Sequence, residues 1–186
     1  MPIENSLLPE DRVKTLKELV DKAKPLKGAT AELGVYNGGV SEYIAKNSGG
    51  YTHYAIDTYE GLPDTLTEKD NIETQWKGRF KPEIDVEKLL KQIKNIKIVK
   101  GFFPKCAKKI KATKFKLVHF DGDLYQSAKD FCEYFYSRMI KGGIMIFDDY
   151  ARGKNPGVSI AVEEFMADKK ETIHKPVLGY AYIVKE

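Results

Sequence analysis

Two apolar runs, each followed by a pair of acidic residues, constrain the fold of this chain more than any other feature. The runs cover residues 115–120 and 144–147, and the residues between them, 126–140, carry apolar side chains at helical spacing. The unit is therefore predicted as strand, helix, strand, with the two strands parallel and the crossover right-handed. The acidic residues that follow the two runs are Asp121, Asp123, Asp148 and Asp149.

These acidic residues predict a divalent-metal site. If the two strands are neighbours in a sheet, their ends lie roughly 5 Å apart. Four carboxylates would then share one edge of the sheet, which is costly unless a cation lies among them. Carboxylate oxygens without histidine or cysteine at the same turns favour a hard cation, Mg²⁺ first and Ca²⁺ or Mn²⁺ after it. His119 lies inside the first run and is expected to pack rather than to bind the metal.

The rest of the chain alternates short apolar strands with amphipathic helices. The predicted helices are 7–24, 40–46, 85–93, 105–111 and 158–166, and the further strands are 29–33, 51–56, 96–99, 172–174 and 180–184. This pattern predicts an α/β fold, a Rossmann-like open, mostly parallel twisted sheet with helices on both faces and a C-terminal antiparallel strand. We expect one domain over residues 1–186. Residues 58–82 are polar and aperiodic, which predicts a lid or substrate loop.

A glycine-rich turn follows the first predicted strand and precedes a helix. It reads Glu32-Leu-Gly-Val-Tyr-Asn-Gly-Gly, and glycines at such a turn let a nucleotide-bearing ligand approach the backbone closely. The spacing differs from the dinucleotide fingerprint, but Asp57 ends the next strand, where a carboxylate grips ribose hydroxyls. Glu32 before the turn suits a ligand with positive charge, such as a sulfonium or an amino group. The pair of features predicts a nucleoside cofactor other than a dinucleotide.

Charge and hydropathy argue against a membrane or nucleic-acid partner. The net charge of +4 comes from scattered lysines, without the clustered arginines and interleaved aromatics of nucleic-acid binding. No apolar run approaches the length of a membrane span and no signal-peptide pattern opens the chain, so a cytoplasmic location is expected. Cys106 and Cys132 are expected to be reduced and buried.

Four motifs, in this order along the chain, resemble the macrocin O-methyltransferase family. They are Glu32-Leu-Gly-Val-Tyr-Asn-Gly-Gly, Asp57-Thr-Tyr-Glu-Gly-Leu-Pro, Asp121-Gly-Asp-Leu-Tyr-Gln-Ser and Gly142-Gly-Ile-Met-Ile-Phe-Asp-Asp-Tyr. The resemblance covers about residues 31–165. It implies a class I methyltransferase that uses S-adenosylmethionine and acts on hydroxyls of sugars in natural products.

The resemblance also implies a role for individual residues. Asp121, Asp148 and Asp149 would bind the metal, and Asp123 would be the general base, with Asp121 beside it in the catalytic centre. The methionine end of the cofactor would meet Glu32, Gly34 and Tyr36, the ribose would meet Asp57, and the adenine would lie near Gly101 and Phe102. The complete set of candidate cofactor-binding residues is Glu32, Gly34, Val35, Tyr36, Gly38, Ser41, Asp57, Thr58, Gly101, Phe102 and Asp121.

The sequence therefore predicts a metal-dependent O-methyltransferase that moves a methyl group from S-adenosylmethionine to a hydroxyl of a sugar or of a similar small polyol or phenolic acceptor. A homodimer is also considered. One alternative is a short-chain-type NAD(P)-dependent oxidoreductase, because Tyr125 and Lys129 have the Y-x-x-x-K spacing. A base-modifying RNA methyltransferase would carry an Asn/Asp-Pro-Pro-Tyr-type turn at 148–150. A cofactor-binding module without turnover is the remaining alternative.

Overall fold

A seven-stranded sheet forms the centre of the computed structural model, which describes residues 2–64, 66–71, 73–151 and 156–186. Within these residues the strand order is β3-β2-β1-β4-β5-β7-β6. The first five are parallel to one another, whereas β7 is antiparallel to both of its neighbours, so the predicted fold class is confirmed. The strands are β1 (Ala29–Leu33), β2 (His53–Asp57), β3 (Ile96–Lys100), β4 (Phe115–Phe120), β5 (Met139–Tyr150), β6 (His174–Val177) and β7 (Gly179–Val184).

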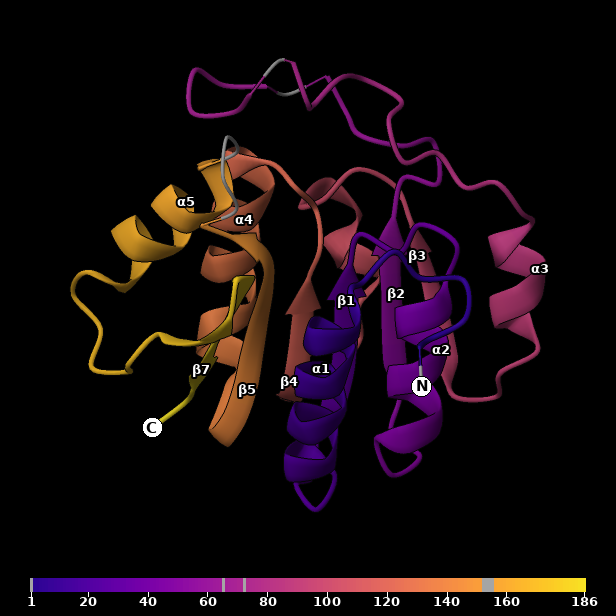
Figure 1. The fold of residues 1–186 in the computed structure, drawn as a ribbon. Helices are drawn as coiled ribbons and strands as arrows, with labels where there is room; N and C mark the ends of the chain where they lie inside the picture. The colour runs from indigo at the N-terminus through magenta and orange to yellow at the C-terminus, as the bar shows by residue number, and fades with distance from the viewer. Residues whose placement is uncertain (1, 65, 72, 152–155) are drawn as a thin grey trace.

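Helices cover both faces of the sheet (Figure 1). One face buries α4 and α5 in a core rich in phenylalanine, and the other face buries α1 and α2 against the alternate side chains of the same strands. The alternation arises because successive strand residues point to opposite faces. The helices are α1 (Glu10–Ala23), α2 (Gly39–Asn47), α3 (Val86–Lys91), α4 (Tyr125–Phe135) and α5 (Gly157–Met166), with 3₁₀ helices at Lys105–Lys109 and Tyr136–Arg138.

The central strand–helix–strand unit has the predicted order, with β4 and β5 parallel and adjacent, but its boundaries differ. The helix was expected to reach residue 140, whereas α4 ends at Phe135 and Met139 already belongs to β5. Asp148 and Asp149 were expected after the strand and instead lie inside it. The reason is that β5 is paired on both sides, and its pairing with β7 continues from Ile144 to Tyr150.

Two further segments differ from the expectation, and a third, residues 58–82, is the loop that the sequence predicts. The predicted helix at 105–111 is the shorter 3₁₀ helix Lys105–Lys109, and the predicted strand at 172–174 begins only at His174. The described residues of 58–82 form turns without a helix or a strand. Figure 1 shows this magenta segment passing above the carboxyl ends of the strands. Its position places a polar loop next to the ligand-binding edge of the sheet.

The other end of the sheet is tied together by Lys116 of β4. This side chain is fully buried, and its ammonium donates hydrogen bonds to the carbonyl oxygens of Lys24 at 3.1 Å, Leu26 at 3.0 Å and Ser48 at 2.7 Å. Burial lowers the pKa of the Lys116 ammonium. The three carbonyls follow α1 and α2, so one lysine joins the ends of two helices to the central strand.

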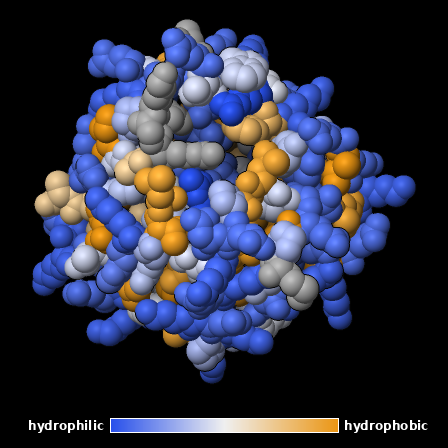
Figure 2. Space-filling view, viewed as in Figure 1, coloured by the Kyte–Doolittle hydropathy of each residue, from blue (hydrophilic) through white to orange (hydrophobic). Residues whose placement is uncertain are grey.

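No helix among the described residues is long and apolar enough to cross a membrane. On the face drawn in Figure 2, hydrophobic residues occur in separate patches between hydrophilic ones. Cys106 and Cys132 are buried and unpaired, as the sequence predicts.

Candidate functional site

The glycine turn after β1 lies directly against the end of β4. Gly34 has a φ of +90°, and a Cβ built there would be 1.9 Å from the carbonyl oxygen of Asp121. The amide of Asp121 donates to the carbonyl oxygen of Leu33 at 2.8 Å, which joins the ends of β1 and β4 beside this contact. Only glycine fits such a position, because it combines a positive φ with a close backbone approach. This backbone contact therefore joins the predicted cofactor turn to Asp121, the first of the acidic residues.

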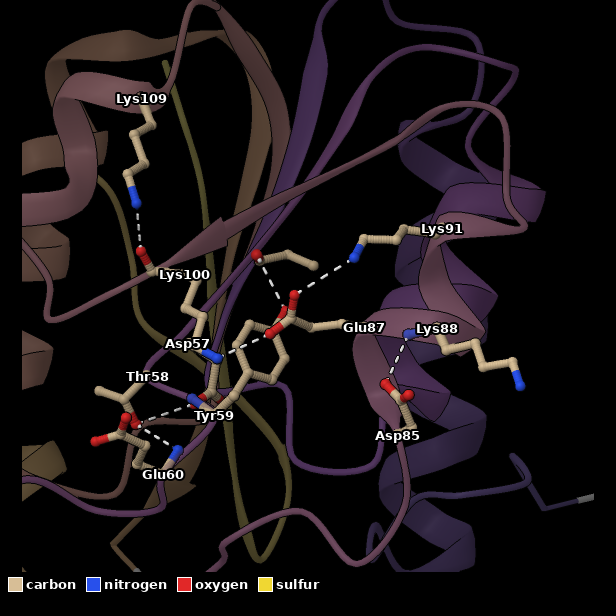
Figure 3. A network of polar contacts seen from close by, with 11 residues as sticks. Asp57, Thr58, Tyr59, Glu60, Asp85, Glu87, Lys88, Lys91, Lys100 and Lys109 are labelled. Carbon is tan, nitrogen blue, oxygen red and sulfur yellow. Dashed lines mark hydrogen bonds and ion pairs between the residues drawn. The ribbon is translucent and has the colours of Figure 1, made fainter.

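Asp57 holds the backbone of the glycine turn. Its Oδ2 accepts hydrogen bonds from the amides of Val35 at 2.6 Å and Tyr36 at 3.3 Å, and its Oδ1 accepts one from the amide of Tyr59 at 2.7 Å. Figure 3 shows Asp57 among its neighbours, with the Lys100–Glu87 ion pair beside it. Three amide donors fix the orientation of this carboxylate. Asp57 therefore shapes the turn in addition to facing the cavity described below.

Glu32 is buried beneath the turn in a chain of polar side chains. Its carboxylate accepts a hydrogen bond from Ser41 and lies 3.0 Å from Nδ1 of His119. Ser41 in turn lies 3.1 Å from Nε2 of His53. Burial raises the pKa of Glu32 and lowers the pKa of His53 to about 3. His119 thus packs against Glu32.

The turn and the acidic residues line one cavity of about 320 Å³. This size lies within the range of small-molecule sites. Gly38 and Ser41 are not part of its lining, because Gly38 packs on α3 and Ser41 lies behind Glu32. The predicted residues that do line it are Glu32, Gly34, Val35, Tyr36, Asp57, Thr58, Gly101, Phe102, Asp121, Asp123, Asp148 and Asp149.

Three of the four carboxylates form a tight group. Oxygens of Asp121, Asp123 and Asp149 all lie within 4.8 Å of one another, and the last two residues are buried. Burial, together with repulsion between these carboxylates, raises the pKa of Asp121 and Asp123 well above the ordinary value. Asp123 and Asp149 have φ values of 59° and 56°, a backbone region that few residues other than glycine adopt. Such strain gathers at functional sites.

Asp148 lies outside this group of three and pairs with Arg12 of α1. Nη1 of Arg12 lies 2.7 Å from Oδ1 of Asp148 and 3.4 Å from Oδ1 of Asp149, and all three side chains are buried. Burial and the Asp149 charge raise the pKa of Asp148 to about 6, against the opposing effect of Arg12. The expected metal ligands were Asp121, Asp148 and Asp149, whereas the closest oxygens belong to a trio that includes Asp123.

Sequence reasoning missed two residues that contact this cluster, Arg12 and Gln75. Nε2 of Gln75 donates to Oδ1 of Asp123 at 3.1 Å, and Gln75 is 3% exposed. Nothing in the polar segment 58–82 distinguishes this glutamine. Arg12 did carry a signal, because it lies in helical register with the apolar residues Leu16 and Leu19, where a charge requires a buried partner.

The donor set fits a hard divalent cation. Three carboxylates with oxygens this close repel one another, and this repulsion adds to burial in raising the pKa of Asp121 and Asp123. A divalent ion would relieve it, and oxygen ligands suit Mg²⁺, Ca²⁺ or Mn²⁺ better than softer metals.

The fold is one that solved Rossmann-like methyltransferases share. Solved structures with this fold include the O-methyltransferase NovP, with a TM-score of 0.81 and 19% identity over 97% of this chain and 82% of that one. CalS11, a calicheamicin methyltransferase, has a TM-score of 0.79 and 20% identity over 98% of this chain and 88% of that one. An O-methyltransferase from Bacillus cereus in complex with SAH has a TM-score of 0.63 and 14% identity over 98% of this chain and 84% of that one.

The chain belongs to the macrocin O-methyltransferase family, whose model matches residues 2–180. It is therefore an O-methyltransferase that uses S-adenosylmethionine, and the predicted family and enzyme class are confirmed. The match does not favour the oxidoreductase or the non-catalytic module. A comparison with curated protein sequences finds no match.

Proposed function

We propose that this methyltransferase depends on a divalent metal and methylates a hydroxyl of a sugar or of a similar small polyol or phenolic acceptor. The observation that carries the proposal is that the glycine turn and the four carboxylates line one cavity and meet where Gly34 touches Asp121. A sugar acceptor is supported by the likeness to CalS11, a TDP-rhamnose 3'-O-methyltransferase. A cytoplasmic location and a homodimer stay predictions from the sequence.

The cofactor is proposed to bind along the glycine turn. Glu32, Gly34 and Tyr36 would meet its methionine end, and Asp57 its ribose, with the adenine near Gly101 and Phe102. All of these residues line the cavity. Because the Asp57 carboxylate already accepts three amide hydrogen bonds, its orientation is fixed before a cofactor binds, which supports the proposed ribose contact.

Methyl transfer from a sulfonium is an in-line displacement, so the enzyme must align the acceptor oxygen and remove its proton. A divalent ion held by Asp121, Asp148 and Asp149 would lower the proton affinity of an acceptor hydroxyl. Arg12 contacts Oδ1 of Asp148, so Oδ2 is the oxygen proposed to face the ion. Asp123 accepts the hydroxyl proton while the oxygen–methyl bond forms and the methyl–sulfur bond breaks.

Residues 58–82 are proposed to act as a lid over the acceptor. Among the contacts that join the described part of this segment to the rest of the fold, Gln75 donates to Asp123, and Oδ1 of Asp70 accepts a hydrogen bond from the amide of Tyr125 at 2.8 Å. The second contact satisfies an amide at the beginning of α4. Limited proteolysis of the segment should slow when cofactor and acceptor are both present, and an unchanged rate would refute the lid.

The decisive experiment combines labelled S-adenosylmethionine with a panel of sugar nucleotides, glycosides and catechols, with Mg²⁺ or with a chelator. We expect methylation of a sugar-bearing acceptor that stops when the metal is chelated. Asp121→Asn and Asp148→Asn should abolish this metal-dependent activity and leave cofactor affinity largely intact. Asp57→Ala should weaken cofactor binding instead.

A matched control for the asparagine variants is Asp130→Asn. Asp130 lies on α4 and accepts a hydrogen bond from Gln126, and it is not one of the four clustered carboxylates. It should retain wild-type activity. Equal loss of cofactor affinity in the Asp57, Asp121 and Asp148 variants would contradict the division of roles, and full activity in the chelator would exclude the metal dependence.

A further inference from the structure

Arg12 places a fixed positive charge inside the carboxylate cluster. Besides Asp148 and Asp149, its guanidinium contacts the carbonyl oxygen of Leu178, to which Nε donates at 3.3 Å. Gly179 makes room for it, because a Cβ at that position would lie 2.0 Å from Nη2 of Arg12. The side chain is 4% exposed. Helix α1, strand β5 and the turn before β7 therefore hold the guanidinium together.

This arginine neutralises part of the charge that would otherwise attract a metal ion. The other described arginine that lines the cavity, Arg79, lies over the rings of Trp76 and Phe80 and makes no ion pair with the cluster. A buried charge within a few ångströms of a ligand acts through a medium that screens it poorly. Arg12 therefore repels any divalent ion near Asp148 and Asp149, and it occupies Oδ1 of Asp148, which leaves only Oδ2 for the ion.

We propose that Arg12 is a positioning residue that serves as a permanent counter-cation: it holds Asp148 in place and keeps divalent-ion binding weak and exchangeable. The inference rests on the proposed metal site, but it concerns how tightly that site binds its ion rather than whether the reaction uses one. With the arginine present, a positive charge already lies against Asp148 and Asp149. Without its charge, the same carboxylates require an ion.

The test measures Mn²⁺ binding by calorimetry, and thermal unfolding with and without Mn²⁺, on the full chain. Arg12→Gln retains a hydrogen-bond donor for Asp148 but removes the charge. We expect its dissociation constant for Mn²⁺ to fall at least tenfold, its melting temperature without metal to fall, and its stabilisation by Mn²⁺ to exceed that of the wild type. Arg12→Lys, which keeps the charge, should stay close to the wild type. Arg138→Gln is the control, because Arg138 lies over the ring of Tyr134 instead.

Each outcome decides a separate point. Unchanged or weaker Mn²⁺ binding in Arg12→Gln, with binding by the wild type, overturns the inference and leaves the proposed function intact. Binding by Arg12→Gln alone supports the inference and overturns metal dependence of the wild type. Binding by neither overturns both. If Arg12→Gln folds only with Mn²⁺, the ion has replaced the arginine, which supports the inference, whereas a variant unfolded with and without Mn²⁺ overturns it.

Discussion

The contact between Gly34 and Asp121 predicts the effect of adding one methyl group there. In Gly34→Ala, the Cβ would lie 1.9 Å from the Asp121 carbonyl oxygen, whereas ordinary contacts begin at 3.4 Å. The ends of β1 and β4 must therefore separate by about 1.5 Å, unless the turn itself rearranges. Either movement breaks the 2.8 Å hydrogen bond between the Asp121 amide and the Leu33 carbonyl.

The free-energy cost of Gly34→Ala has two parts. A left-handed backbone at a residue other than glycine costs about 1–2 kcal/mol. The lost backbone hydrogen bond adds about 0.5–1.5 kcal/mol, and the local rearrangement adds to this. We therefore expect the free energy of unfolding to fall by roughly 2–4 kcal/mol, which corresponds to a melting temperature lower by about 2–4 °C per kcal/mol for a chain of this length.

Gly50→Ala separates the two parts. Gly50 has a φ of +78°, close to the +90° of Gly34, but no atom lies within 4 Å of a Cβ built there. This control should lose only the 1–2 kcal/mol of backbone strain. Urea denaturation gives both free energies, and calorimetry should show S-adenosylhomocysteine binding at least tenfold weaker in Gly34→Ala and unchanged in Gly50→Ala. Equal destabilisation of the two variants, to within about 0.5 kcal/mol, would refute the argument.

Three further predictions follow from other buried contacts. Gln75→Ala should lower kcat by about tenfold without changing cofactor affinity, because Asp123 loses a hydrogen bond that orients it; an unchanged kcat in initial-rate assays would count against this. Although burial opposes it, hydrogen bonds from Lys185 and Tyr136 lower the pKa of Glu171 to about 2. The stability that the Glu171 carboxylate contributes is thus present above pH 4.5 and lost as the pH falls toward 2. Urea titrations should show Glu171→Gln less stable than the wild type by at most about 3 kcal/mol at pH 7, and no less stable than the wild type near pH 2. Lys116→Met should lose about 2–4 kcal/mol in the same titrations, because three carbonyls lose their donor, with S-adenosylhomocysteine affinity unchanged.

The order of the strands and helices could be predicted because it depends on local patterns. Each apolar run of the parallel sheet is short, lies between turn residues and alternates with a helical segment, so β1, β2, β3 and β4 appear within two residues of their predicted bounds. The family motifs identified the turn and the acidic residues. Both lie at the carboxyl ends of strands, where residues in an α/β sheet meet a ligand.

Contacts between distant segments were not predictable in this way. Met139 suits the helical spacing of α4, but it belongs to β5, because its partner in β4, Phe115, completes a parallel ladder. Arg12 and Asp148 are separated by 136 positions, and Gln75 and Asp123 by 48, so no local pattern connects them. Arg12 and Asp148 meet because a buried charge requires a partner of opposite charge. Gln75 reaches Asp123 from a turn without regular structure, which has no periodic sequence pattern.

Trp76 gives this enzyme a built-in reporter. It is the one tryptophan of the chain, it lies in the segment proposed to close over the acceptor, and it is 52% exposed beside the guanidinium of Arg79. Indole emission from the unmodified protein therefore originates at a single place. A change in its intensity or wavelength on addition of a ligand would follow that segment in real time, without a dye or an engineered label.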